Sequence, residues 1–211
     1  WIISESGNPD VEIIYIDLAS LKSVRAFVEE IFKREAPVAL LMNNSGIMEQ
    51  QGRTITEDGM ERTVQVNYVG HYLLSRLLVP KMERGSRIVS MTSLTYRWGR
   101  IDFPTFFDSG CRGSYWRIFP YFNSKLAITL FTIKLAKELK DKGIMVNCAD
   151  PGIVATDIIY FKMWFDSLTR VFFAPYIRTP RQGAATAIRL LLSKDVEGQT
   201  GTFNLSCHEK K

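Results

Sequence analysis

The sequence predicts an α/β fold, a doubly wound parallel sheet with helices on both faces. Two observations carry this prediction. Short apolar runs rich in β-branched residues alternate with longer segments whose apolar residues recur every three or four positions. Polar residues and glycines directly follow most of the apolar runs, and ligands of such folds bind at this carboxyl edge of the sheet. Any functional site is therefore expected there.

The expected elements alternate along the whole chain. Strands are expected at residues 12–16, 38–42, 87–91, 144–148 and 201–205. Helices are expected after Ser20, over about residues 58–82 and 121–140, and from Thr179-Pro180 onward. Ser20 and Thr179 suit the N-cap position, because a hydroxyl can accept a hydrogen bond from a free N–H of the first turn.

Composition narrows the class of protein. The chain has 211 residues, of which 46% are hydrophobic, so a single domain over residues 1–211 is expected. Its net charge of +5 comes from scattered basic residues, which does not indicate a nucleic-acid partner. The three cysteines and two histidines share no ligand spacing, so no metal site is expected. Cysteine usage favours a reducing compartment. An intracellular location is expected, with a cytoplasmic and an endoplasmic-reticulum or other membrane-associated location both left open.

Four residues are candidates for chemistry. Tyr121 and Lys125 lie four positions apart on a predicted helix, so both can act on one ligand. A nearby ammonium favours the phenolate, which would make Tyr121 a usable acid or base. Ser93 follows a predicted buried strand and can be held rigidly at the sheet edge. Asn67 lies among apolar neighbours inside a predicted helix, where a buried amide indicates a specific polar task.

Six short motifs resemble those of the short-chain dehydrogenase/reductase family, and within it the retinol-dehydrogenase-like branch. In this sequence they are Asp17-Leu18, Asn43-Asn44-Ser45-Gly46, Asn67-x-x-Gly70-His71, Ser93 in Arg-Ile-Val-Ser-Met-Thr-Ser, Tyr121-x-x-x-Lys125 and Pro151-Gly152-x-x-x-Thr156. Each motif alone is a weak signal. Together they occur in the family's order over nearly the whole chain, and that combination is specific.

The resemblance implies a Rossmann-like sheet and an NAD(P)-dependent oxidoreductase that interconverts an alcohol and a carbonyl. Tyr121 would exchange the proton, Ser93 would orient the substrate oxygen, Lys125 would lower the Tyr121 pKa and hold the nicotinamide ribose, and Asn67 would hold a water beside Lys125. The implied catalytic residues are thus Asn67, Ser93, Tyr121 and Lys125. The implied cofactor contacts are Asp17, Leu18, Asn43, Ser45, Gly46, Tyr121, Lys125, Pro151, Ile153 and Thr156.

One family feature is missing from the sequence. No Thr-Gly-x-x-x-Gly-x-Gly motif occurs, although its glycines let a helix N-terminus approach the cofactor's pyrophosphate. We therefore expect an N-terminally truncated sheet that lacks the family's first two strands, with a gap beside an unpaired strand at residues 12–16. NADP is the expected cofactor, with NAD as the alternative, and the chain alone is expected to be marginally stable and to bind either weakly.

Two alternatives stay open. The first is an oxidoreductase for a small lipophilic alcohol or carbonyl, such as a retinoid, steroid or prenol. The second is a truncated, non-catalytic fragment that acts at most as an interaction module. An aromatic-rich insertion at residues 102–120 fits the first, and the apolar segment at 158–177 is either a substrate lid, a lipid-facing helix or core. Peripheral membrane contact and self-association are the further partners considered.

Overall fold

A continuous five-stranded sheet forms the centre of the molecule. The computed structural model describes residues 2–49, 52–108, 116–154 and 177–210. Within them the strands run in the order β1-β2-β3-β4-β5, of which the first four are parallel and the last is antiparallel. Their bounds are β1 Leu40–Asn43, β2 Arg87–Met91, β3 Met145–Asp150, β4 Phe203–Leu205 and β5 His208–Lys210. The parallel α/β class expected from the sequence is confirmed.

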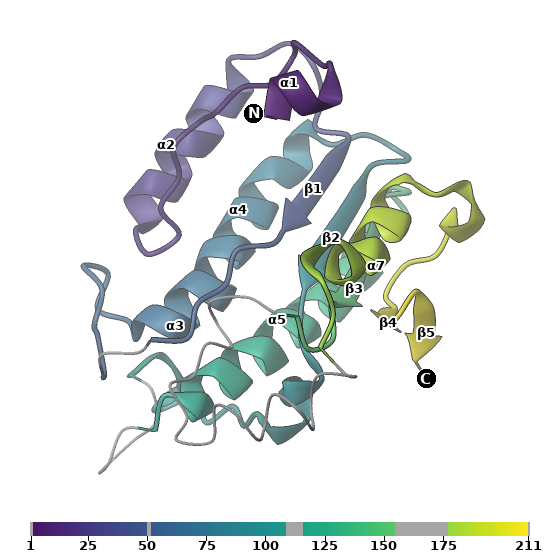
Figure 1. Ribbon diagram of the computed structural model, residues 1–211. Coiled ribbons are helices and arrows are strands. Elements are labelled where there is room, and N and C mark those ends of the chain that lie inside the picture. Colours follow the sequence, from purple (N-terminus) through teal and green to yellow (C-terminus); the bar gives the residue numbers. More distant parts are fainter. Residues whose placement is uncertain (1, 50–51, 109–115, 155–176, 211) are drawn as a thin grey trace.

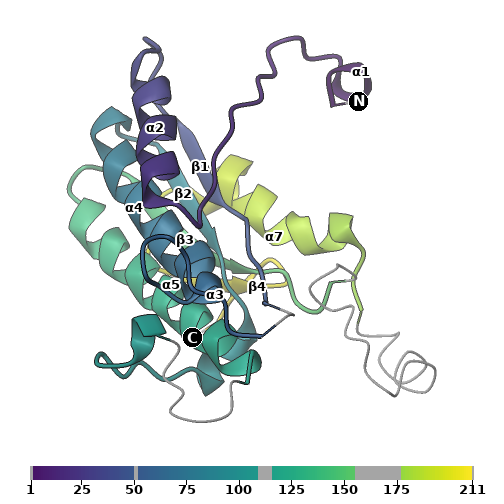
Figure 2. The same ribbon diagram turned by 90° about the vertical axis from the view of Figure 1, so that its left-hand side faces the viewer.

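Helices cover both faces of this sheet (Figures 1 and 2). Helix α5 packs on β2 and β3 from one side, and α7 packs on the same two strands from the other. Helices α2 and α4 pack on each other on the α5 side. The bounds are α1 Ile2–Ser6, α2 Leu21–Phe32, α3 Arg62–Val64, α4 Gly70–Leu78, α5 Ile118–Leu139 and α7 Pro180–Leu192. Strand β3 is buried at all six positions, as a sheet covered on both faces requires.

The prediction of a strand at residues 12–16 is wrong. These residues have no regular secondary structure, and Ile13 is 96% exposed. An extended segment becomes a strand only when a neighbouring backbone pairs with it, and no described strand lies beside this one. The expected gap inside the sheet is also wrong. The sheet is continuous, and β1 forms its edge.

The helix expected over residues 58–82 begins later and changes type. Helix α3 is followed by a π-helical turn, Gln65–Val69, then by α4 and a 3₁₀ turn, Val79–Lys81. A π turn accommodates an extra residue in a helix and often marks a functional site. Asn67 lies in this turn, so the sequence found the residue but not its unusual backbone.

The remaining expected elements differ mainly at their ends. Helix α5 begins at Ile118 rather than Tyr121, because Pro120 is tolerated in a first turn. Thr179 caps α7 in a capping box with Gln182, and Ser20 caps α2, both at the expected positions. Most of the apolar segment at 158–177 and part of the insertion at 102–120 lie outside the described residues. Of the helices in the described part of the chain, none is both long and apolar enough to cross a bilayer.

Candidate active site

The centre of the site lies on helix α5. Tyr121 and Lys125 are one turn apart, and the Lys125 Nζ atom lies 5.6 Å from the centre of the Tyr121 ring. The Lys125 ammonium also donates a hydrogen bond of 3.1 Å to the carbonyl of Met91, the last residue of β2. Lys125 is buried. The helix therefore presents a phenol and an ammonium together at the carboxyl end of the central strands.

Ser93 completes the group from the loop after β2. Its backbone is extended and caps the 3₁₀ turn Leu94–Trp98, with the Ser93 Oγ accepting a hydrogen bond from the Thr95 N–H. The Ser93 hydroxyl is near enough to Tyr121 to lower the Tyr121 pKa. The sequence predicted that Ser93, Tyr121 and Lys125 would lie close together, and the structure places them so.

A cavity of about 560 Å³ opens beside these side chains. Tyr121 and Lys125 line one part of it, and the loops after β1 and β3, the carboxyl ends of β1 and β2 and the start of α7 line the rest. The lining from those two loops is Asn44, Ser45, Gly46, Ile47, Pro151, Gly152 and Val154. The cavity thus has the volume of a small-molecule site and contains two groups able to exchange a proton.

Asn67 fastens three parts of the site together. Its Oδ1 accepts a hydrogen bond of 2.8 Å from the Ile47 N–H, and its Nδ2 donates to the Ile47 carbonyl at 2.9 Å. The same Nδ2 donates to the Ser124 hydroxyl at 3.1 Å. Both amide hydrogens are therefore used in holding the loop after β1 against α5. Asn67 is 1% exposed. A buried amide needs hydrogen-bond partners, and Ile47 and Ser124 supply them.

The loop after β1 divides into structural and cavity-lining positions. Asn43 is buried and its Nδ2 donates to the Ser75 hydroxyl at 2.8 Å, so this side chain ties β1 to α4 rather than lining the cavity. Ser45 and Gly46 do line it. At Gly46 an added Cβ would stand 3.5 Å from the Lys125 Nζ, so a larger residue would crowd the ammonium. Asn44, which we did not single out from the sequence, lines the cavity instead of Asn43.

Burial dominates the titration of the site. Burial and the charge of Asp150 raise the pKa of Tyr121 to about 12, and the hydrogen bond from Ser93 opposes this shift. Burial lowers the pKa of Lys125 to about 8, and Asp150 opposes that shift. The sequence predicted a lowered Tyr121 pKa. The direction is the opposite, because desolvation of the phenolate and the charge of Asp150 outweigh the effect of Ser93, and Tyr121 is therefore a protonated phenol at neutral pH.

His71 supports the same loop from α4. Its Nε2–H donates a hydrogen bond of 2.8 Å to the Ser45 carbonyl, which requires a proton on Nε2. Burial lowers the His71 pKa to about 4; the hydrogen bond to Ser45 opposes the shift and the charge of Lys125 adds to it. His71 is part of a motif quoted from the sequence, but the sequence assigned it no role.

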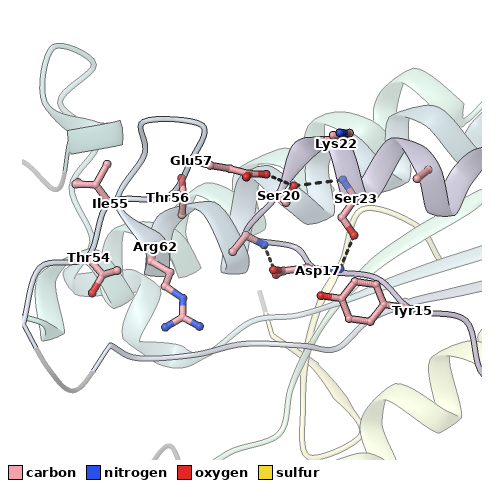
Figure 3. A pocket seen from close by; sticks show the side chains of 12 residues that line it. Tyr15, Asp17, Ser20, Lys22, Ser23, Thr54, Ile55, Thr56, Glu57 and Arg62 are labelled. Carbon is pink, nitrogen blue, oxygen red and sulfur yellow. Dashed lines mark hydrogen bonds between the residues drawn. The ribbon is translucent and has the colours of Figure 1, made fainter.

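Asp17 and Leu18 lie apart from this group. Asp17 lines a separate hollow of about 590 Å³ near the start of α2, shown in Figure 3, and its Oδ1 accepts a hydrogen bond from the Ala19 N–H. Leu18 packs instead against Gly70, where an added Cβ would lie 2.7 Å from the Leu18 carbonyl oxygen. The glycine of the Asn-x-x-Gly-His motif thus permits this close approach.

The loop after β3 carries the last group of expected cofactor contacts. Pro151 lines the cavity, and the Ile153 carbonyl accepts a hydrogen bond of 2.7 Å from the Arg178 N–H. Thr156 lies outside the described residues. Asp150, the last residue of β3, went unnoticed in the sequence although it directly precedes the Pro-Gly pair. The sequence feature that could have drawn attention to Asp150 is an acidic side chain at the end of a buried apolar strand, where burying a charge is costly.

No metal site competes with this interpretation in the part of the chain that the structure describes. There, no three His, Cys, Asp or Glu side chains gather closely enough to hold an ion. The arrangement of a buried phenol, ammonium and hydroxyl beside a cavity at a parallel-sheet edge defines a class: α/β enzymes that move a proton beside a bound cofactor or substrate.

Sequence comparison identifies the family within that class. The family model described as short chain dehydrogenase matches residues 2–106 and 109–162. The chain belongs to this family. It is similar to retinol dehydrogenase 14 of Mus musculus, with 39% identity over 93% of this chain and 59% of that protein. It is also similar to polyprenol dehydrogenase of Mus musculus, with 35% identity over 96% of this chain and 62% of that protein.

Solved structures agree on the fold. The blue fluorescent protein from a metagenomic library, solved with NADPH, has a TM-score of 0.66 at 25% identity over 90% of this chain and 72% of its own. A short chain dehydrogenase from Burkholderia cenocepacia, solved with NADP, has a TM-score of 0.67 at 24% identity over 91% and 73%. The chain spans only about 60% of the length of the curated relatives it matches.

Proposed function

We propose that this chain carries the proton-transfer half of an NAD(P)-dependent active site that interconverts a lipophilic alcohol and its carbonyl compound. The single observation that supports this most is that Tyr121 and Lys125 line one cavity with Ser93 beside Tyr121. The Ser93 hydroxyl acts on Tyr121 and lowers its pKa, and the Lys125 ammonium lies 5.6 Å from the centre of the Tyr121 ring. Each motif alone is common, whereas this juxtaposition serves a defined reaction.

The site favours carbonyl reduction, because this direction uses Tyr121 in the protonation state that it has at neutral pH. A substrate oxygen in the cavity would accept hydrogen bonds from the Ser93 and Tyr121 hydroxyls. The Tyr121 pKa of about 12 keeps the phenol protonated, so it can donate its proton as negative charge develops on that oxygen. Oxidation requires the phenolate, which only a closer approach of the Lys125 cation would stabilise.

The cavity fits one end of a nicotinamide cofactor. Backbone groups of the loops after β1 and β3 and the Lys125 ammonium surround it, and Gly46 leaves room directly beside that ammonium. Lys125, Ser45 and Pro151 would hold the nicotinamide end. When bound, the cofactor supplies or accepts the hydride. NADP is proposed ahead of NAD, because both solved structures named above hold NADP or NADPH.

The substrate class rests on the relatives. Retinol dehydrogenase 14 and polyprenol dehydrogenase are named for long apolar alcohols, and this chain is more than one-third identical to each over nearly its whole length. We propose a retinoid- or prenol-like substrate on that basis. An intracellular location, in the cytoplasm or at a membrane surface, belongs to the same proposal.

The proposal is tested by following NADPH consumption with retinal as the acceptor. Millimolar NADPH is used, because the sequence has no glycine-rich loop for the pyrophosphate. Tyr121→Phe should lower kcat by more than about 100-fold, or about 2.7 kcal/mol. Tyr15→Phe is the matched control, since Tyr15 is 78% exposed and lines the separate hollow. It should keep full activity.

Two results would count against this function. If Tyr121→Phe keeps more than about a tenth of kcat, a loss under about 1.4 kcal/mol, Tyr121 is not the proton donor. If wild type binds NADPH but transfers no hydride to any aldehyde or ketone, the second hypothesis is favoured, that of a non-catalytic fragment acting as an interaction module.

A further inference from the structure

Aromatic side chains are exposed around the start of α5. Among the described residues, six phenylalanine and tryptophan side chains are exposed, and five of them lie between positions 98 and 119: Trp98, Phe103, Phe107, Trp116 and Phe119. Scattered exposed apolar residues are common on protein surfaces, whereas a concentration of them marks an interaction site. The proposed reaction gives these side chains no task.

The segment at residues 94–108, which we call the strap, packs closely beside the start of α5 (Figure 1). An added Cβ at Gly99 would lie 2.6 Å from the Phe122 carbonyl oxygen, so the glycine permits this close approach. The Arg100 N–H donates a hydrogen bond of 2.8 Å to the Asn123 Oδ1 atom. The exposed aromatic rings of the strap therefore belong to a packed segment and not to a loop that lies away from the protein.

The rings of the strap and of α5 form one surface. The ring centroids of Trp98 and Phe122 lie 5.7 Å apart. Phe119 lies one turn before Phe122 on the same side of the helix. Trp116 lies just before the helix, and its carbonyl accepts a hydrogen bond of 2.9 Å from the Phe119 N–H. We call Trp98, Trp116, Phe119 and Phe122 the aromatic surface.

Two arginines flank the aromatic surface. Arg97 and Arg100 lie on either side of Trp98 and Gly99, and both are exposed. Neither forms an ion pair within the part of the chain that the structure describes. Both acids of the strap already have partners within the chain: Asp102 binds Thr105, and Asp108 binds Arg53.

This combination of side chains fits an anionic lipid surface. Tryptophan is favoured at the boundary between water and hydrocarbon, because its ring is apolar and its N–H is polar. Arginines without an acidic partner are attracted by anionic headgroups. The surface also adjoins the proposed active site, since Ser93 directly precedes the strap and Tyr121 lies between Phe119 and Phe122 on α5.

We propose that the aromatic surface, together with Arg97 and Arg100, binds this chain to an anionic lipid bilayer and places the cavity beside Tyr121 at the headgroups. Long apolar alcohols partition into bilayers, because the hydrocarbon is thereby removed from water. A substrate of the proposed class would then reach the cavity from the lipid. That use of the surface rests on the proposed function, whereas lipid binding itself needs neither cofactor nor turnover.

The apolar part of the proposal is tested by co-sedimentation of the full chain with vesicles of phosphatidylcholine and phosphatidylserine. Wild type should bind, and Trp98→Ser combined with Phe119→Ser should weaken binding by at least about tenfold, because apolar area buried in the interface is lost. Ile13→Ser combined with Tyr15→Ser is the matched control. It removes two exposed apolar side chains from the segment without regular structure and should leave binding unchanged.

The charged part is tested with a second pair of variants. Arg97→Gln combined with Arg100→Gln should weaken binding to the same vesicles by at least about fivefold, and should have little effect with phosphatidylcholine alone. Lys22→Gln combined with Arg25→Gln removes the same charge from exposed positions of α2 and should have a much smaller effect. Equal losses from the two pairs would show that net charge and not this surface attracts the lipid, which would overturn the proposal.

Two further results would overturn it. The first is a folded wild-type chain that binds neither kind of vesicle. The second is self-association without vesicle binding, abolished by Trp98→Ser combined with Phe119→Ser in sedimentation velocity, which would assign the surface to a second copy of the chain. Vesicle binding without hydride transfer from NADPH to retinal would refute the proposed function alone. Hydride transfer by a chain that binds no vesicles would refute the lipid-binding surface alone.

Discussion

The active-site end of this molecule and the region around residues 11–16 differ in how fully their polar and backbone groups are partnered. At the active-site end, Asn67 ties the loop after β1 to α5, Asp150 accepts a hydrogen bond from the Gly152 N–H of its own turn, and both Lys125 and Asp150 are buried. At the other, residues 11–16 have no regular structure, and an apolar hollow of about 330 Å³ lies between Ile16, β1 and α4. The difference teaches that local side-chain partners can complete a site, whereas a strand depends on neighbouring backbone.

The largest expected contrast is in stability. Ile88 in β2 is fully buried and Ile13 is 96% exposed, so the same substitution tests both regions. Ile88→Ala should lower the free energy of unfolding by about 2–5 kcal/mol. Ile13→Ala should change it by less than about 0.5 kcal/mol. Urea denaturation measures both, and a comparable loss in Ile13→Ala would show that residues 11–16 are packed as a strand in solution.

His71 offers a second contrast, in pH dependence. The folded pKa of about 4 lies below the unfolded 6.5, so protonation favours the unfolded chain. This contribution to stability is present above pH 6.5 and is lost as the pH falls toward 4, up to about 3 kcal/mol. His71→Gln removes it while keeping a donor for the Ser45 carbonyl. Unfolding at pH 7 and pH 4.5 should therefore separate wild type from variant only at the lower pH.

An equal pH dependence in the two proteins would contradict this. It would mean that the His71 ring is hydrated or charged in the folded state, and that the loop carrying Ser45 is held by other contacts.

The smallest expected effect concerns Gly70, where the two regions meet. An added Cβ would lie 2.7 Å from the Leu18 carbonyl oxygen, so Gly70→Ala must displace residues 17–18 or α4. We expect a loss of about 1–3 kcal/mol in the free energy of unfolding. Gly46→Ala is the control, because its new contacts start at 3.5 Å. Equal stability of the two variants would show that Leu18 yields freely, as a loosely held segment would.

The sequence predicted most of the fold because periodicity reports burial. Strands β2 and β3 and helices α2, α5 and α7 lie where their apolar patterns placed them, with ends shifted by at most three residues. The prediction of a strand at residues 12–16 was wrong because the residue pattern is that of a strand, while strand pairing depends on a neighbour distant in sequence. The π turn was missed because sequence spacing does not reveal the Ile47 and Ser124 groups that the Asn67 side chain of this turn binds.

The candidate site was predicted only as far as short motifs reach. Ser93, Tyr121 and Lys125 were found because their spacing on known element types brings them together. The sequence did not reveal Asp150 as a neighbour of Lys125, since β3 and α5 meet only through the fold. It also gave the wrong direction for the Tyr121 pKa, because burial and the charge of Asp150 raise that pKa and neither could be read from the spacing of Tyr121 and Lys125.

The most direct test of the central claim is an isotope measurement. NADPH carrying deuterium at the transferred C4 position is incubated with the chain and retinal, and the retinol is analysed by mass spectrometry. The account predicts one deuterium per product molecule with wild type, and a yield lower by more than about 100-fold with Lys125→Met, which keeps a chain of similar length but no charge. Unlabelled product, or equal labelled yields from the two proteins, would contradict it.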